Sequence, residues 1–160
     1  MPVERRFRLL YVAIAGVVLI CDQWTKAMVE SAVLPDEFIP VIPHFFNLTN
    51  TRNPGAAFGL LSDSPAAWKT ALLIVVSLLL LLAVLVFVLK SRRLGRSTGV
   101  AMGLILGGAA SNLLDRFRYG QVTDFLDFYV GQYHWYTFNL ADSAIVIGAG
   151  LLILGLLVTE

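Results

Sequence analysis

The chain has 160 residues, of which 58% are hydrophobic and 14% charged, with a formal net charge of +1 at pH 7 and a mean hydropathy of +0.76. An ordinary soluble domain carries about 25% charged residues, so the composition predicts an integral membrane protein and gives no sign of nucleic-acid binding. One domain is expected over residues 1–160, and the single cysteine, Cys21, excludes an intrachain disulfide.

Four apolar stretches follow one another along the chain. At about 1.5 Å per residue, roughly 20 residues of helix cross the hydrocarbon core of a bilayer. Helices are the expected spanning structure because lipid offers no hydrogen-bond partner to a bare backbone. We therefore predict an all-α membrane protein with four transmembrane helices, over residues 9–29, 66–89, 98–114 and 140–158.

The first stretch follows a basic segment and reaches Cys21, as a cleaved lipoprotein signal peptide would. Such a signal requires a small residue before the cysteine, and Ile20 is large. The helix is therefore predicted to be retained. Asp22 and Lys26 near its end are four residues apart, which puts them on one helix face, and they are interpreted as a structural ion pair.

The connections on the other side of the membrane carry different signals. Between the first two helices, apolar residues alternate with Pro40 and Pro43, and a dense turn signal occupies residues 50–55. This pattern predicts a small β-containing extracytoplasmic platform. Residues 117–138 are expected to form a short outer loop or helix between the third and fourth helices, with aromatic residues at the membrane interface.

Basic residues predict the orientation. Short segments rich in lysine and arginine stay in the cytoplasm. Two such segments occur, one before the first helix and one between the second and third: Arg5, Arg6, Arg8, Lys90, Arg92, Arg93 and Arg96. Both termini are therefore predicted to be cytoplasmic, and the loops 31–65 and 117–138 to face outside.

Two aspartates, Asp124 and Asp142, lie at the outer margins of apolar segments. An ionised carboxylate costs several kcal/mol there unless it is paired or lines a wet cavity. Two carboxyl groups within about 3 Å share one proton, so one can activate water while the other polarises a carbonyl. The pair predicts hydrolysis without a metal. Acids at helix ends also occur as caps, so the spacing alone leaves both interpretations open.

Other chemistries fit less well. His44 and His134 share no ligand spacing with Cys21, so no metal site is predicted. Ser143 and Lys26 could form a serine/lysine site, but Ser143 is equally suited to starting a helix. Buried acids also suit a proton-relay transporter or channel, although no inverted repeat supports a transporter. A structural adaptor would leave the polar residues of the outer side unexplained.

Five motifs in order along the chain resemble those of the lipoprotein signal peptidase (signal peptidase II) family: residues 22–26 (DQWTK), 52–59 (RNPGAAFG), 107–116 (GGAASNLLDR), 122–128 (VTDFLDF) and 138–144 (FNLADSA). The resemblance implies an aspartic endopeptidase of the bacterial cytoplasmic (inner) membrane, without cofactor. Its substrates would be diacylglyceryl-modified prolipoproteins, cut on the N-terminal side of the lipidated cysteine. Membrane lipids and globomycin-like cyclic peptide inhibitors are the implied partners.

The same resemblance assigns roles to residues. It makes Asp124 and Asp142 the catalytic pair, and it assigns support of the pair and the substrate to Asn53, Gly55, Asn112, Arg116 and Asn139.

Spacing on the third helix agrees with this assignment. Asn112 and Arg116 are four residues apart and face one side, whereas Asp115 points elsewhere. Asp127 is the second-choice acid, sharing the face of Asp124 if that segment is helical. Ser111 stands where the family usually has glycine. The platform is expected to cover the site, with Gly55 and Phe58 near its tip.

Reporter fusions test the orientation. A reporter fused after Glu160, or within residues 92–95, is expected to lie in the cytoplasm. A reporter inserted near Asp36 is expected to lie outside. Paired fluorescent-protein and phosphatase fusions measure this. A cytoplasmic reporter at Asp36 would show that the protein has the inverted orientation, in which Asp124 and Asp142 are separated from exported substrates.

Overall fold

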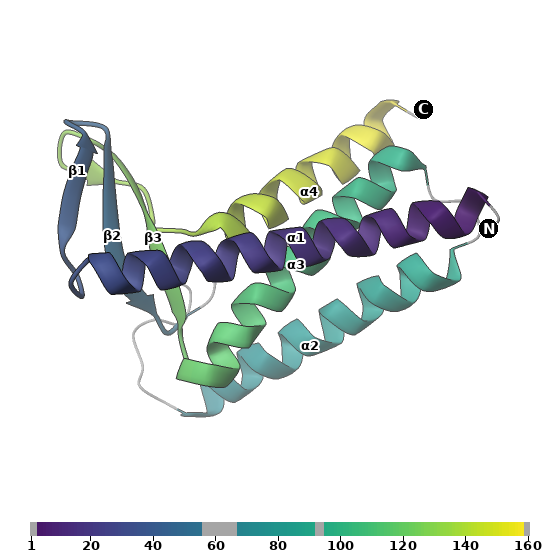
Figure 1. Cartoon of the computed structure of the whole chain (residues 1–160), viewed down its shortest axis with the longest axis horizontal. Helices are drawn as coiled ribbons and strands as arrows, with labels where there is room; N and C mark the ends of the chain where they lie inside the picture. Colours follow the sequence, from purple (N-terminus) through teal and green to yellow (C-terminus); the bar gives the residue numbers. More distant parts are fainter. Residues whose placement is uncertain (1–2, 56–66, 92–94, 159–160) are drawn as a thin grey trace.

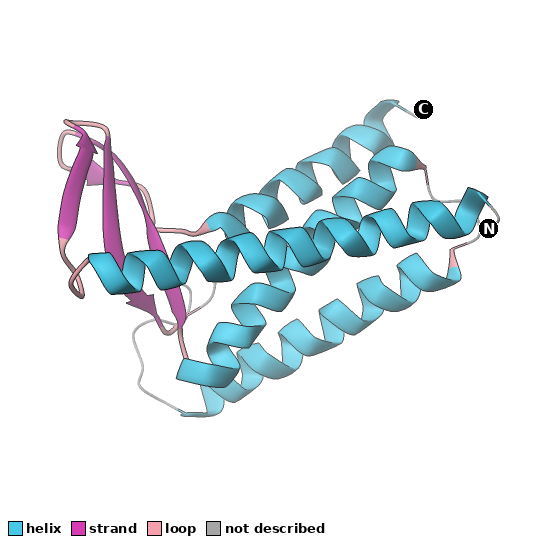
Figure 2. Ribbon diagram, in the orientation of Figure 1, coloured by secondary structure: helices cyan, strands magenta, loops and turns pink. Residues whose placement is uncertain are grey.

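The structure is a computed structural model that describes residues 3–55, 67–91 and 95–158. Helices run alongside one another, and the strands form a layer at one end of them (Figures 1 and 2). The two ends of the chain lie together at the opposite end of the helices (Figure 1). The elements in chain order are α1 (Val3–Ala32), β1 (Phe38–Ile42), β2 (Phe46–Asn53), α2 (Ala67–Lys90), α3 (Arg96–Tyr119), β3 (Val122–Val130), β4 (Tyr133–His134) and α4 (Leu140–Val158).

The length and apolar composition of the helices in the described residues are those of a multi-pass membrane protein. Three segments are long and apolar enough to cross a bilayer, Leu9–Ala32, Thr70–Lys90 and Arg96–Tyr119, and Leu140–Gly155 is a shorter apolar helix. α4 has the predicted bounds, whereas α3 runs five residues beyond the predicted end at 114. Residue 66, the predicted start of the second span, lies outside the described residues. The fourth span stays a prediction.

Glycines let α3 approach its neighbours closely. A Cβ atom on Gly107 would lie 2.6 Å from the carbonyl oxygen of Ala15 on α1, and one on Gly108 would lie 2.4 Å from that of Ala141 on α4. Small residues at such crossings allow backbones to pack by van der Waals contact, which drives helix association in lipid. α3 is therefore the central helix, in contact with α1, α2 and α4.

The strands form one antiparallel sheet in the order β1-β2-β3-β4. The predicted β-structure is thus present as a small antiparallel sheet. Apolar contacts among Val29 of α1, Val33 just after this helix and Phe125 of β3 join the sheet to the helices. Asp124 on β3 is opposite Thr51 on β2, beside an irregularity in the register between Leu48 and Thr51.

The prediction of a short outer loop or helix between the third and fourth helices is wrong. Gly120, in the left-handed conformation at φ 73°, ends α3, with its N–H bonded to the carbonyl oxygen of Arg116. Residues Val122–Val130 then form strand β3, which pairs with β2. β-Branched and aromatic residues in this segment favour an extended backbone.

Substitution of a close-packed glycine tests the packing. Gly108→Ala should lower the free energy of unfolding by about 1–3 kcal/mol, because its methyl group would overlap the backbone of Ala141. Thermal unfolding in detergent measures the change. Gly150→Ala on α4 is the matched control, since no atom lies within 4 Å of its added Cβ. Equal melting temperatures for the two variants would contradict the packing.

Candidate active site

Asn139 joins the two predicted acids. It caps the start of α4, where its Oδ1 accepts the backbone N–H of Asp142 at 2.9 Å, the bond expected of an N-cap side chain. Its Nδ2 donates to Asp124 Oδ1 at 2.7 Å. Asn139 is fully buried, so one side chain sets the position of the β3 acid relative to the α4 acid. Asp124 and Asp142 therefore lie together.

Asn112 on α3 bonds to Asp142 and to Asn139, the residue that bonds to Asp124. Its Nδ2 donates to Asp142 Oδ1 at 2.7 Å. Its Oδ1 accepts from Lys26 Nζ at 3.0 Å and from Asn139 Nδ2 at 3.2 Å. Because both neighbours of the oxygen are donors, the amide group has one consistent orientation, with its N–H groups directed at Asp142.

Asn53 brings the end of β2 to Asp124. Its Nδ2 donates to Asp124 Oδ2 at 2.9 Å, and its Oδ1 accepts the backbone N–H of Gly55 at 2.9 Å. Arg116 donates to the carbonyl oxygen of Gly55 at 3.0 Å and to that of Asn112 at 3.3 Å. Arg116 thus ties the turn after β2 to α3. The predicted platform tip at Phe58 lies outside the described residues.

The surroundings of Asp124 favour its protonated form. Burial, followed by the negative charge of Asp142, raises the pKa of Asp124 to about 7, against the opposing effect of its bonds to Asn53 and Asn139 and of the Lys26 charge. The Asp124 side chain is 1% exposed. Two interacting carboxyl groups titrate as a pair, so the protonation of Asp124 is coupled to that of Asp142.

A buried ion cluster lies behind the acids, between α1 and α3. Lys26 Nζ is 2.6 Å from Asp22 Oδ2 and 2.7 Å from Asp115 Oδ2. Ser111 Oγ donates to Asp22 Oδ2 at 2.7 Å, and Gln23 Nε2 donates to Asp115 Oδ1 at 2.6 Å. The predicted Asp22–Lys26 pair is present. Asp115 bonds to Lys26, as Asn112 does, so these two side chains of α3 meet at one ammonium group.

The third member of this cluster was not predicted. Asp115 follows Ser111 by four residues, as Lys26 follows Asp22, so two rows of polar residues face each other across the α1–α3 contact. The sequence does contain a signal for this contact, because each of the two apolar helices carries a pair of polar residues four positions apart.

Asp127 does not share the face of Asp124, and that expectation is wrong. The segment is a strand, in which residues three apart point to opposite faces. Asp127 accepts a hydrogen bond from Asn47 Nδ2 at 2.7 Å and lies 2.9 Å from His134 Nδ1. Asp127 therefore joins β2, β3 and β4 on the other side of the sheet.

The serine/lysine alternative is not formed. Ser143 Oγ donates to the carbonyl oxygen of Asn139 at 3.0 Å, as a residue in the first helical turn. Lys26 is held by two carboxylates. Within residues 3–55, 67–91 and 95–158, no three histidine, cysteine, aspartate or glutamate side chains are grouped as metal ligands.

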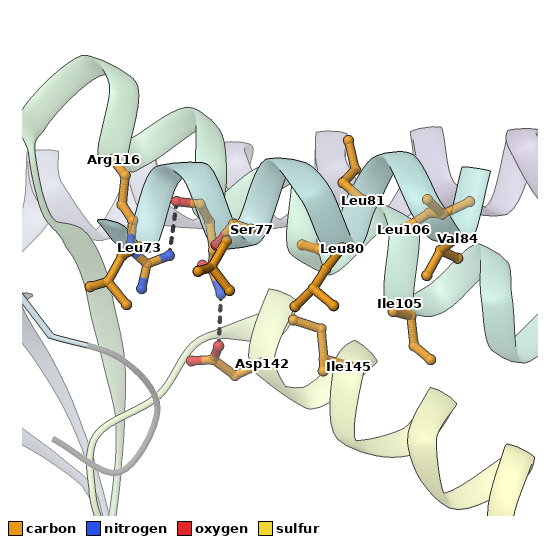
Figure 3. Close-up of a pocket in the computed structure, with 13 residues that line it drawn as sticks. Leu73, Ser77, Leu80, Leu81, Val84, Ile105, Leu106, Arg116, Asp142 and Ile145 are labelled. Carbon is orange, nitrogen blue, oxygen red and sulfur yellow. Dashed lines mark hydrogen bonds between the residues drawn. The ribbon is translucent and has the colours of Figure 1, made fainter. Parts of the chain in front are cut away.

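An apolar groove of about 320 Å³ opens beside the acids, between α2, α3 and α4. Figure 3 shows Asp142 and Arg116 at one end of it and leucine, isoleucine and valine side chains along the rest. Ser77 is the polar residue that α2 contributes. Binding sites are typically apolar clefts with a few convergent polar groups, and this groove has that form. The lining residues are Leu73, Val76, Ser77, Leu80, Leu81, Val84, Ile105, Leu106, Ala109, Asn112, Arg116, Asp142 and Ile145.

The sequence matches a known family over nearly its whole length. The profile of the family described as signal peptidase (SPase) II aligns with residues 14–158. The chain belongs to the signal peptidase II family. Lipoprotein signal peptidases of Solibacter usitatus and Pelotomaculum thermopropionicum are 43% and 47% identical to it, over 90% and 92% of this chain and 88% and 91% of theirs.

Solved structures agree with this membership. Two bacterial membrane enzyme structures, determined by the in meso method at 2.3 and 1.9 Å resolution, superpose with TM-scores of 0.82 and 0.80. Both are 36% identical to this chain and cover 92% of it; the chain covers 87% and 92% of them. The arrangement of helices and sheet described above is therefore shared with enzymes of the membrane.

Proposed function

We propose that the chain is an aspartic endopeptidase that removes the signal peptide from diacylglyceryl-modified prolipoproteins. One observation carries the proposal: Asp142, which is joined to Asp124 through Asn139, lies at one end of an apolar groove. Family membership supports the substrate class, since the curated relatives are named lipoprotein signal peptidases. The cut is placed on the N-terminal side of the lipidated cysteine.

The pair can carry out the hydrolysis with one shared proton. The ionised carboxylate removes a proton from water, whose oxygen attacks the scissile carbonyl, while the protonated carboxyl group donates to the carbonyl oxygen. When the tetrahedral intermediate collapses, the carboxyl group that took the proton from water passes it to the departing amine of the cysteine. The other carboxylate takes back the hydroxyl proton as the carbonyl re-forms, which restores the pair. Asn53, Asn112 and Asn139 hold the two acids, and Arg116 holds the turn at Gly55 beside them.

The groove suits a substrate that is itself a membrane helix. Apolar side chains of α2, α3 and α4 line most of it, and the charged residues Arg116 and Asp142 lie at one end (Figure 3). A signal peptide can lie along the apolar part, with its scissile bond at Asp142 and its acyl chains in membrane lipid. A globomycin-like cyclic peptide that places a hydroxyl group between the acids would occupy the same end and inhibit.

The architecture supports a specific placement in the bacterial inner membrane. In this proposal α4 is the fourth span, both termini are cytoplasmic and the sheet is an extracytoplasmic platform. The sheet and the chain ends lie at opposite ends of the helices (Figure 1), which supports their being on opposite sides of the membrane. Exported prolipoproteins then meet the acids at the outer surface. Residues 1–160 act as one peptidase domain.

Substitution of either acid tests the mechanism. Asp124→Asn and Asp142→Asn should each lower kcat by at least about a thousand-fold, because one carboxyl group cannot serve as both base and acid. Cleavage of a lipidated precursor by purified protein in detergent measures the loss, with thermal unfolding as the check on folding.

Asp127→Asn is the matched control for this experiment. It removes a carboxylate equally buried in the same strand, 1% exposed, but on the other face of the sheet. Its kcat should stay close to wild type. Residual activity above a few per cent in folded Asp124→Asn or Asp142→Asn would refute the pair, and proton flux in vesicles without cleavage would favour the relay alternative.

Lipid dependence tests the substrate. A buried methylene contributes about 0.8 kcal/mol, so a diacylglyceryl group should both concentrate the precursor in the membrane and fix the depth of its cysteine. We expect cleavage of the lipidated precursor and little cleavage of the same chain with a bare cysteine. Gel analysis of matched amounts in vesicles measures this. Equal cleavage would refute the substrate and leave the aspartic chemistry standing.

A further inference from the structure

Lys26 touches the candidate site from behind, without reaching the groove. It is 3% exposed, does not line the groove, and makes three polar contacts, to Asp22, Asp115 and Asn112. A buried ion pair often contributes little net stability, because desolvation offsets the attraction between the charges. Stability alone therefore gives a poor account of an ammonium group at this place.

We propose that Lys26 is a positioning residue for the proposed aspartic chemistry: it holds the Asn112 amide so that Nδ2 faces Asp142. The proposal rests on the proposed function. Lys26 Nζ donates to Asn112 Oδ1 at 3.0 Å, and Asn112 Nδ2 donates to Asp142 Oδ1 at 2.7 Å. An ammonium group has donors only, so it forbids the flipped amide, which would direct Oδ1 at the carboxylate of Asp142.

The two carboxylates bound by Lys26 also hold the backbone beside each acid. Asp22 Oδ1 accepts the N–H of Ala141, the residue before Asp142, at 2.9 Å. Asp115 Oδ2 accepts the N–H of Thr123, the residue before Asp124, at 3.4 Å. The ammonium group is thus the common partner of the two groups that fix the start of α4 and the start of β3.

Lys26 also contributes charge. The charged groups packed around Asp124 and Asp142 are Asp22 and Lys26 on α1 and Asp115 and Arg116 on α3, while Arg52 on β2 is directed at Glu30 and Thr123. The groove-lining residues of α2 carry no charge. A cation favours ionised carboxylates. Without Lys26 the pair should therefore need a higher pH to supply its ionised base.

Lys26→Gln and Lys26→Arg test the proposal in cleavage assays of the lipidated precursor in detergent, with rates expressed per folded molecule. Lys26→Gln should lower kcat roughly ten- to hundred-fold, the range expected from a small misplacement of catalytic groups, with KM nearly unchanged. The acid limb of its pH–rate profile, where kcat falls as the pH is lowered, should move to higher pH. Lys26→Arg retains the charge and should keep the acid limb at the wild-type pH.

A double-mutant cycle shows whether Lys26 acts through Asn112. Lys26→Gln should cost little further activity in an Asn112→Ala background, because the group that it positions is already absent. Multiplying losses would overturn the proposal. If Lys26→Gln is not recovered folded, the cycle is run with Lys26→Arg, whose N–H donors lie at a different position from the lysine ammonium. Lys26→Arg should then lower kcat when it is the only substitution, and should have no further effect in the Asn112→Ala background.

Two control variants separate this effect from loss of stability or charge. Val88→Ala removes packing at a fully buried site on α2, and Arg118→Met removes an exposed cation that bonds to Gln23. Neither should move the pH profile. A wild-type profile and kcat in folded Lys26→Gln would refute the positioning role, whereas failure of the wild-type protein to cleave would refute the proposed function instead.

Discussion

The contact on which the rest of the site depends is the buried ammonium group of Lys26 between Asp22 and Asp115. It joins α1 to α3, and the carboxylates continue the contact to the backbone before Asp142 and before Asp124. Charges taken out of water cost free energy unless every polar atom is partnered. The structure meets this condition with Ser111 and Gln23, so the cluster can hold helices and sheet in one geometry.

In this geometry the two acids have a polar side, which faces the ion cluster, and an apolar side, which faces the groove. Asn112 belongs to both parts, since it bonds to Lys26 behind the acids and lines the groove in front of them. Beyond Asn112 the groove is almost entirely apolar. A peptide bond can therefore be held among polar groups while the helix attached to it stays in a lipid-like environment. The proposed substrate has this combination of parts.

Much of this arrangement could be predicted from the sequence, and the remainder depends on contacts between distant segments. Asp124 and Asp142 stand out because carboxylates are costly beside apolar segments, and the small residues of α3 indicate close packing. Strand β3 was missed because its pairing with β2 joins residues about 70 to 80 positions apart. Predicting the contact of Asp115 with Lys26 requires the rotation of α1 relative to α3, and neither helix sequence specifies that rotation by itself.

Infrared spectroscopy of the purified protein offers the most direct test of the shared proton. The account predicts a protonated-carboxyl band at weakly acidic pH that disappears with a midpoint near pH 7, as expected from the raised pKa of Asp124. The band should be absent from Asp124→Asn and retained in Asp127→Asn. A titrating band that persists unchanged in Asp124→Asn, or no such band in the wild-type protein, would contradict the account.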